Sequence, residues 1–204
     1  MVEQGTSRRG RPVSEASRVG ALASAAELLD ERGWAGFSVD EVARRSRVGK
    51  ATIYKHWPTG FALAVQAWGD RVTAAVPTLN SGDARRDLHD QVVRLARFYR
   101  SRSGAVAVEL LGAGVSAENG AELIAAHFFG VRRAATLALV REGIERGQLS
   151  GELDPQLVID VLFGPIVFRL VNGMPPLTDA EAGTLAELTL GALAEDGRSL
   201  DLHE

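Results

Sequence analysis

Apolar residues recur at every third or fourth position along most of this chain, which is the period of an amphipathic α-helix. No segment shows a convincing strand pattern, and no internal repeat is evident. The clearest stripes are Val19, Leu22, Ala26 and Leu29; Leu88, Val92, Leu95, Ala96 and Tyr99; Leu123, Ala126, Val131, Ala135 and Ala138; Leu157, Val158, Val161, Leu162 and Ile166; and Leu185, Leu188, Ala192 and Leu193. The pattern predicts an all-α protein of about nine helices.

Helix-boundary signals divide these stripes into separate helices. Ser14 can cap the first helix, and Gly33 is placed to end it. The Asp154-Pro155 pair predicts a helix start, because proline is tolerated in a first turn whose N–H groups have no partner within the helix. Thr178 and Glu181 have the spacing of a capping box, which predicts where the last helix begins.

Two other segments predict breaks or bends. Residues 78–83 join two helical regions and form the best domain boundary, and Gly164-Pro165 predicts a kink inside an apolar helix. The predicted organisation is a basic flexible arm (1–13), a DNA-binding domain (14–60), a connecting helix (61–80) and a C-terminal effector-binding and dimerisation domain (81–204).

Residues 38–57 predict two short helices joined by a tight turn. Ser38 and Glu41 have capping-box spacing at the start of the first helix. The second helix has an apolar face that includes Ile53, and its opposite face is basic and aromatic. The first apolar face comprises Val39, Val42 and Ala43, the second Val48, Ile53 and Trp57, and the outward residues are Lys50, Tyr54 and Lys55. This is a helix-turn-helix, which predicts binding to duplex DNA.

The net charge of −3 is unevenly distributed, and the distribution agrees with that prediction. Residues 1–60 hold ten Lys and Arg against seven Asp and Glu, whereas residues 61–204 hold thirteen against nineteen. The basic part is therefore the part that contains the motif. The arm carries Arg8, Arg9 and Arg11, which predicts contact with a phosphate or a minor groove.

The composition of the chain argues against several other classes of protein. The chain has no cysteine, no run of eighteen apolar residues and no apolar stretch after its polar N-terminus, so we expect a soluble cytoplasmic protein without a membrane partner. Its four histidines lack metal-ligand spacing, and no Ser-His-Asp or paired-carboxylate arrangement stands out. We therefore expect no metal, no cofactor and no enzymatic activity.

The chain resembles the TetR family of transcriptional regulators. The resemblance rests on residues 36–43, Gly-Phe-Ser-Val-Asp-Glu-Val-Ala, and 48–57, Val-Gly-Lys-Ala-Thr-Ile-Tyr-Lys-His-Trp. It implies a homodimer, a double-stranded operator with two half-sites, and an unidentified small-molecule effector. The effector would bind in the C-terminal domain and move the two DNA-binding heads apart, most often releasing a repressor from its operator.

The resemblance also implies roles for individual residues. Tyr54 and His56 would contact phosphate, and Lys50, Ala51, Thr52 and Lys55 would lie nearest the base edges. Ser38, Val48 and Gly49 complete the predicted DNA-binding set together with the arginines of the arm. Three positions depart from the family pattern: Arg47 occupies a turn position that is commonly glycine, Gly49 replaces a frequent serine cap, and Gly60 stands where a phosphate-contacting lysine is usual.

The C-terminal half offers a predicted pocket and a predicted interface. By resemblance the helix around His127 lines the pocket, and aromatic bodies with a few polar groups suit such a site. The predicted pocket residues are Phe98, Tyr99, Glu109, His127 and Phe128. The apolar density of residues 157–171 and 185–193 predicts a dimer interface. Its residues are Leu157, Val161, Leu162, Ile166, Leu185, Leu188 and Ala192.

Two alternative functions stay open from the sequence. Residues 112–117, Gly-Ala-Gly-Val-Ser-Ala, fit a G-x-G-x-x-A pattern after an apolar run, so a nucleotide- or small-molecule-binding enzyme built around residues 106–133 is one alternative. The pattern lacks the alternating strands and helices of a dinucleotide-binding fold, which favours close helix packing or a helix break instead. The other alternative is an architectural DNA binder without an effector.

Overall fold

The computed structural model describes residues 15–152 and 154–193. These residues form helices and connecting loops, and no strand occurs among them. The elements are α1 (Glu15–Arg32), α2 (Val39–Ser46), α3 (Lys50–His56), α4 (Gly60–Ala75), α5 (Ala84–Tyr99), α6 (Arg102–Gly114), α7 (Gly120–Leu123), the π-helical segment η1 (Ile124–Gly130), α8 (Val131–Glu145), α9 (Pro155–Val171) and α10 (Asp179–Ala192). Because α7, η1 and α8 form one unbroken helix, the described part of the chain contains nine helices, as the sequence predicts.

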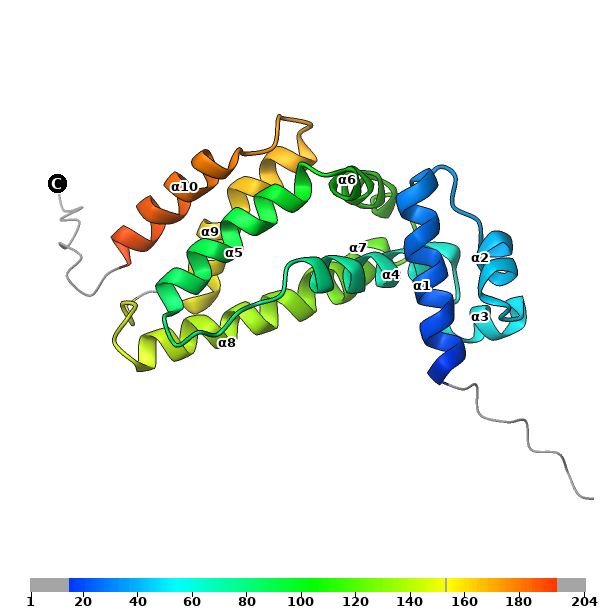
Figure 1. Ribbon diagram of the computed structural model, residues 1–204, viewed down its shortest axis with the longest axis horizontal. Coiled ribbons are helices and arrows are strands. Elements are labelled where there is room, and N and C mark those ends of the chain that lie inside the picture. The colour runs from blue at the N-terminus through cyan, green and yellow to red at the C-terminus, as the bar shows by residue number, and fades with distance from the viewer. Residues whose placement is uncertain (1–14, 153, 194–204) are drawn as a thin grey trace, which may run out of the picture.

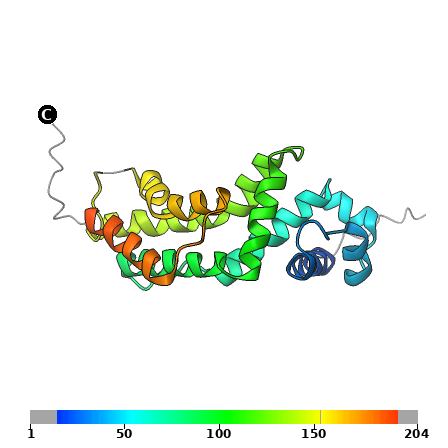
Figure 2. The same ribbon diagram turned by 90° about the horizontal axis from the view of Figure 1, so that it is seen from above.

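The molecule is elongated, with its two ends built from different helices. α1, α2 and α3 form a head at one end, and α5, α8, α9 and α10 form a bundle at the other (Figure 1). α4 runs from the head into the bundle, and α6 lies beside α1 where the two parts meet (Figures 1 and 2). The loop between α4 and α5 contains residues 78–83, where the sequence predicts a domain boundary.

α4 belongs to both hydrophobic cores. Ala62, Leu63 and Ala67 pack in the core of the head, while Val65 and Trp68 pack in the core of the bundle. A helix that is apolar on nearly every side is expected only where protein surrounds it. The head and the bundle therefore share one rigid element.

The backbone of η1 touches α4 directly. A β-carbon built on Gly69 of α4 would overlap the carbonyl oxygen of His127 in η1. Only glycine lets the two helices approach this closely, and π-helical turns are uncommon enough to mark a special packing site. This contact joins the long helix of the bundle to the helix that enters the head.

Several predicted helix boundaries are confirmed. Gly33 ends α1 with φ +67°, and the Asp154 side chain accepts a hydrogen bond from the N–H of Gln156 at the start of α9. Thr178 and Glu181 form both hydrogen bonds of the capping box. The predicted cap at Ser14 lies outside the described residues.

One predicted cap is wrong. Ser38 is the N-cap residue of α2, but its side chain makes no capping hydrogen bond. The carboxylate of Glu41 instead accepts hydrogen bonds of 2.8 Å from Arg44 and 2.9 Å from Arg45. Hydrogen bonds between two ions are stronger than those to a neutral backbone N–H, and the arginines therefore hold the carboxylate away from Ser38.

The long helix from Gly120 to Glu145 is long and apolar enough to span a membrane by length and composition. It packs against α4, α5 and α9 in this fold, and it carries Arg132 and Arg133 near its middle. Such an arrangement is that of a bundle helix, because charged residues are costly at the centre of a bilayer.

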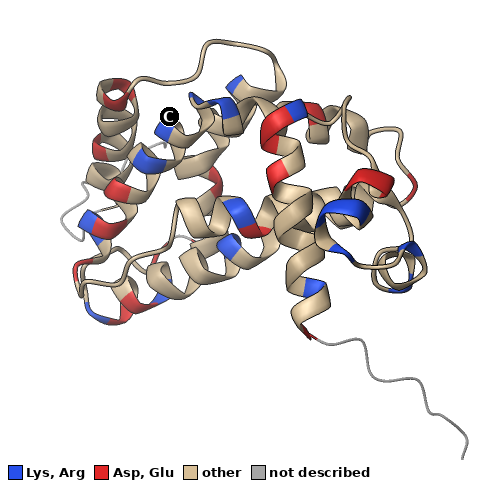
Figure 3. Cartoon of the chain, turned by 45° about the vertical axis from the view of Figure 1, so that its right-hand side comes forward, with Lys and Arg blue, Asp and Glu red and all other residues tan. Residues whose placement is uncertain are grey.

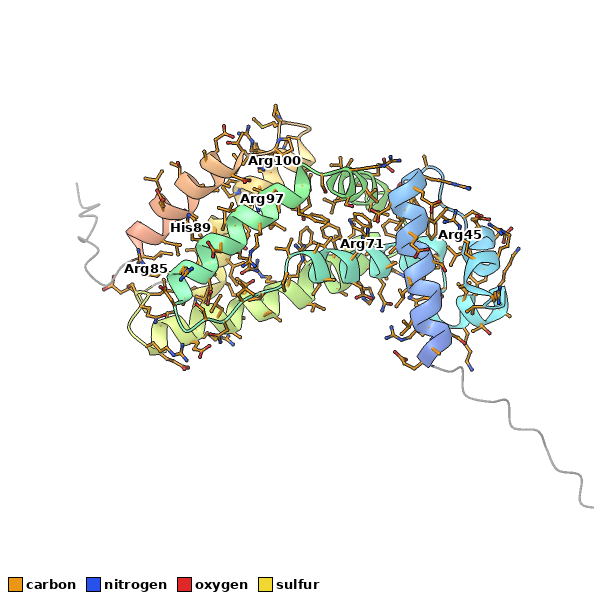
Figure 4. The ribbon with its side chains drawn as sticks, viewed as in Figure 1. Arg45, Arg71, Arg85, His89, Arg97 and Arg100 are labelled. Atoms are coloured by element: carbon orange, nitrogen blue, oxygen red, sulfur yellow. The ribbon has the colours of Figure 1, made fainter. Side chains whose placement is uncertain are left out.

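An ion-pair cluster joins α5 to the start of α10. Asp179 accepts hydrogen bonds from Arg97, at 2.6 Å, and from Arg100, and Arg100 also donates to the carbonyl of Leu177 at 2.5 Å. Figure 4 shows the two arginines at the end of α5 nearest α10. The hydrogen bond from Arg97, and then the one from Arg100, lower the pKa of the Asp179 carboxyl to about 2.

Candidate functional site

α3 is held by its apolar face and presents its polar face to solvent. Ile53 and Trp57 are buried against α2 and α4, and the indole N–H of Trp57 donates to the side-chain oxygen of Gln66 at 2.7 Å. Tyr54 is 47% exposed although it is a large aromatic residue. Such exposure is costly unless a partner covers the ring, which makes this face a candidate binding surface.

Most of the predicted DNA-binding residues lie on α3 or in the turn before it, and Ser38 is the N-cap residue of α2. The exposed ones are Ser38, Gly49, Lys50, Ala51, Tyr54, Lys55 and His56, and Val48 and Thr52 are partly buried beside them. α3 contains lysines and no acidic residue, whereas the bundle carries charges of both signs (Figure 3). Arg8, Arg9 and Arg11 lie outside the described residues.

The turn before α3 has the geometry expected of a helix-turn-helix. Arg47 has φ 56° and ψ 25°, so it adopts the left-handed conformation that a glycine usually supplies. The Ser46 hydroxyl donates to the carbonyl of Val42 at 2.7 Å and accepts from the N–H of Val48 at 3.3 Å. The first of these bonds fixes the Ser46 side chain against α2, and the second spans Arg47 and supports the conformation of the turn.

Ion pairs tie α2 to α1 and neutralise part of the basic charge. Arg45 bonds to Glu41 within α2 and to Glu31 of α1 at 2.7 Å, and Figure 4 shows it between the two helices. The hydrogen bonds from Arg44 and Arg45 lower the pKa of Glu41 to about 2. Lys50 at the start of α3 forms an ion pair with Asp40 of α2. Asp40 would therefore compete with DNA for the ammonium group of Lys50, which is predicted to lie near the base edges.

The bundle contains a partly open cavity of about 380 Å³ lined by three helices. α5 supplies one wall, η1 and α8 the second, and α9 the third. The lining residues are Gln91, Leu95, Tyr99, Phe129, Arg132, Arg133, Thr136, Ile159, Asp160, Phe163, Gly164 and Val167. The walls are mainly apolar with a few polar groups, which is the composition of a small-molecule site.

Of the five residues predicted to line a pocket, Tyr99 lies on this cavity and the others do not. Phe128 is 2% exposed within the bundle core, and Phe98 packs near Trp68. Glu109 accepts a 2.5 Å hydrogen bond from the backbone N–H of Trp34, at the junction of α6 with the head. His127 meets α4 through its backbone.

The residues predicted for a dimer interface divide between the surface and the core. Leu162 and Ile166 are buried within the bundle of a single chain, and Leu185 is partly buried. Leu157, Val161, Leu188 and Ala192 are exposed, and Leu188 is the most exposed of these leucine and valine residues at 71%. The exposed face of α9 also includes Phe168 and Val171, two residues outside the predicted interface set.

The glycine pattern at residues 112–117 has a packing role. Gly112 and Gly114 form the last turn of α6, and no strand precedes them within the described chain. A β-carbon on Gly114 would overlap the side chain of Ile124, and one on Gly120 would overlap the backbone of Gly114. Gly114 thus allows α6 to contact the helix that follows it, whereas a β-carbon on Gly112 would meet no neighbouring atom. The enzyme alternative receives no support.

No group of three or more His, Asp or Glu side chains that could hold a metal occurs among the residues the structure describes. The fold and the two sites instead define a class: a helix-turn-helix DNA-binding protein with a separate small-molecule cavity.

Comparisons with known proteins identify the family within that class. Residues 21–64 match the bacterial regulatory proteins of the tetR family, and residues 79–189 match the tetracyclin repressor-like C-terminal domain. The chain belongs to the TetR family of transcriptional regulators.

Its relatives include proteins of similar length. The HTH-type transcriptional regulator YdeS of Bacillus subtilis (strain 168) is 38% identical over 165 residues, covering 81% of this chain and 83% of YdeS. The DNA-binding transcriptional repressor TetR of Mycobacteroides abscessus is 28% identical, covering 86% of this chain and 93% of that protein. The crystal structure of the TetR family transcription regulator SCO0332 superposes with a TM-score of 0.80 at 30% identity, covering 88% of this chain and all of that one.

Proposed function

We propose that this protein is a cytoplasmic, homodimeric transcriptional repressor that a small molecule releases from its operator. The exposed face of α3 carries this proposal, because Tyr54, Lys55 and His56 stand outside a buried anchor in the geometry that docks a helix in the major groove. Family membership supports DNA binding, and the repressor from Mycobacteroides abscessus supports repression.

The proposed roles on α3 follow its geometry and the family resemblance. Tyr54 and His56 contact phosphates, which positions the helix, and Lys50, Thr52 and Lys55 lie nearest the base edges with Ala51. The arginines of the N-terminal arm reach an adjacent phosphate or minor groove. Lys50 has to break its ion pair with Asp40 before it can contact DNA. This cost reduces the contribution of Lys50 to the affinity for every DNA sequence, so the other base contacts account for more of the sequence specificity.

A homodimer is proposed from the apolar surface of α9 and α10. Leu157, Val161 and Phe168 follow one exposed side of α9, and Leu188 is exposed on α10. Contiguous apolar surface of this kind marks an interface, and a two-fold copy of the same patch would cover it. Two heads would then reach successive major grooves about 34 Å apart or somewhat more.

The cavity is the proposed effector site. Phe129 of its wall belongs to η1, and η1 contacts Gly69 of α4, the helix that continues into the head. A ligand that favours a different position of η1 would therefore change the position of the head. We expect the effector to weaken operator binding by about tenfold or more, a usual size for coupling between two sites.

The first experiment selects DNA from a random library with the full chain and footprints the selected sequence. Two protected half-sites about one helical turn apart, bound by a dimer, are the expected result. Equal affinity for selected and random DNA, with bending of both, would identify an architectural binder instead.

Substitutions on α3 then test the roles of its residues. Lys50→Ala should weaken the selected operator by about fivefold or more and random DNA by less, because a base contact carries sequence information. Tyr54→Phe should weaken both DNAs to a similar extent, since it removes a neutral phosphate contact. Asp40→Asn serves as the control because it frees Lys50, and it should tighten binding. Equal losses on both DNAs for Lys50→Ala would assign Lys50 to phosphate.

A further inference from the structure

The cavity contains polar groups that the protein itself leaves unpaired. The side-chain oxygen of Gln91 and the hydroxyl of Tyr99 are both buried without a hydrogen-bond partner, and each residue is 4% exposed. An unpaired buried polar group costs free energy that a ligand can recover by bonding to it. Both residues lie on the cavity-lining face of α5, two turns apart.

The hydrogen-bond network fixes what each of these groups offers. The Thr136 hydroxyl donates to the carbonyl of Arg132 at 2.9 Å, so it accepts from the amide of Gln91 at 2.9 Å. Gln91 therefore keeps its oxygen free as an acceptor. Burial raises the pKa of the Tyr99 phenol more strongly than Arg132 lowers it, so Tyr99 stays neutral at physiological pH and keeps a proton to donate.

The two arginines of the cavity differ in their partners. Arg133 is neutralised by Asp160 at 2.6 Å and also donates to the side chain of Gln156. Arg132 is partly buried, donates to the backbone carbonyl of Phe128 at 3.0 Å and 3.3 Å, and lies over the Phe128 ring. Its guanidinium is also near enough to the Tyr99 hydroxyl to act on the pKa of that group. Among the described residues no carboxylate lies within ion-pair distance of Arg132. The cavity wall therefore carries one uncompensated positive charge.

We propose that the cavity binds a compact aromatic carboxylate that also carries a hydroxyl or N–H donor. The carboxylate pairs with Arg132 and accepts a hydrogen bond from the Tyr99 hydroxyl, and the donor group of the ligand reaches the free oxygen of Gln91. Phe129 and Phe163 enclose the flat ring system. Guanidinium recognises a carboxylate through charge and paired N–H groups, and the cavity volume is near the lower end of small-molecule sites, which suits one or two rings.

This inference rests on the proposed function only in treating the cavity as a ligand site, and its test needs no DNA. The probes are hydroxynaphthoates and hydroxybiphenyl carboxylates, each compared with its neutral primary amide. Binding to the full-length protein is measured by calorimetry. We expect at least one acid to bind about tenfold or more tightly than its amide, because a charge-assisted hydrogen bond is roughly twice as strong as a neutral one.

Arg132→Gln is the decisive variant. It should remove the preference for the acid over the amide while changing the amide affinity by less than about threefold. Arg141→Gln, the same change at an exposed position of α8, should leave the preference intact. The unliganded Arg132→Gln protein should unfold at the same temperature or higher, because a charge without a counterion is removed. Tyr99→Phe should weaken binding of the acid while the protein keeps part of its preference for the acid over the amide.

Three results would overturn the proposal: amides that bind as tightly as acids, an acid preference that survives Arg132→Gln, or no binding by either series at about millimolar concentration. Operator affinity measured with and without the acid tests the proposed regulatory function separately from the proposed ligand class. Arg132-dependent binding without operator release would reject effector coupling and keep the ligand class. Release by a neutral compound that fills the cavity would keep the regulator and reject the ligand class.

Discussion

α3 and α9 are built alike on the inside and oppositely on the outside. Each anchors itself with buried apolar residues, Ile53 in α3 and Leu162 in α9. The outer face of α3 carries lysines and Tyr54, while the outer face of α9 carries Val161 and Phe168. Since the buried faces are similar, the exposed faces distinguish the partners: a polyanion for α3 and an apolar surface for α9.

The largest expected effect comes from placing a charge on the apolar face. Leu188→Arg should separate the proposed dimer, because an unpaired guanidinium would have to be buried in the interface. Operator affinity should fall by about a hundredfold or more, since two linked heads gain that much over one. Light scattering and operator titration measure the two effects.

Glu187→Arg is the matched control for that experiment, because it places arginine at the neighbouring exposed position of α10, away from the leucine face. It should leave the protein dimeric. A monomer for the unmodified protein at micromolar concentration would contradict the interface, and so would a Leu188→Arg dimer with full operator affinity.

A smaller effect is expected from adding charge beside the polar face. Gly60→Lys should add one phosphate contact per subunit, and the slope of log affinity against log salt should steepen by about two units per dimer. Random DNA should gain as much as the operator. Titrations at three salt concentrations measure the slope.

Gly60→Ala separates charge from packing in that experiment. A β-carbon at position 60 would lie 3.1 Å from a methyl group of Val39, so both variants require a small adjustment of α2. Alanine should leave the salt slope unchanged. If lysine also leaves it unchanged, position 60 does not face the DNA backbone.

The smallest expected effect concerns the two carboxylates that each accept hydrogen bonds from two arginines. Glu41 in the head and Asp179 in the bundle have pKa values of about 2, lowered from 4.5 and 3.8. Their contribution to folding is therefore complete above those ordinary values and is lost as the pH falls toward 2. Glu41 and Asp179 are only partly buried, so solvent screens both ion pairs and the contribution is small.

Thermal unfolding between pH 5 and pH 2 measures how much stability these two carboxylates contribute. Asp179→Asn should reduce the loss of stability over that range, and Glu41→Gln should do the same for the head. Glu187→Gln is the control variant, because it removes a carboxylate at an exposed position of α10. An identical pH profile for all three variants would show that the hydrogen bonds from the arginines contribute nothing measurable.

Local signals were enough to predict most of the fold, including the helix-turn-helix. The left-handed turn at Arg47 and the capping box at Thr178 depend on a few neighbouring residues, and sequence displays such neighbours directly. The cap at Ser38 failed because Glu41 had stronger partners one turn further along the same helix. Local patterns predict which bonds are available, and competition decides which of them form.

The cavity was harder to predict because its walls come from three separate helices. Tyr99 belongs to a predicted apolar stripe and Phe128 was predicted to line the pocket, yet only Tyr99 lies on the cavity, and Phe128 fills the core. Two signals could have found the site: Gln91 is a polar residue inside the apolar stripe of α5, and the arginine pair at 132–133 interrupts an apolar helix. Both are polar residues where the period requires apolar ones.

The contact at Gly69 has a mechanical consequence. Side chains between two helices act as a compliant layer, because they can change rotamer and absorb a small displacement. Between α4 and η1 that layer is missing at this point, since backbone meets backbone. The joint is therefore stiff: α4 has to follow a shift of η1 or separate from it, and any side chain introduced at position 69 would act as a wedge that forces the separation.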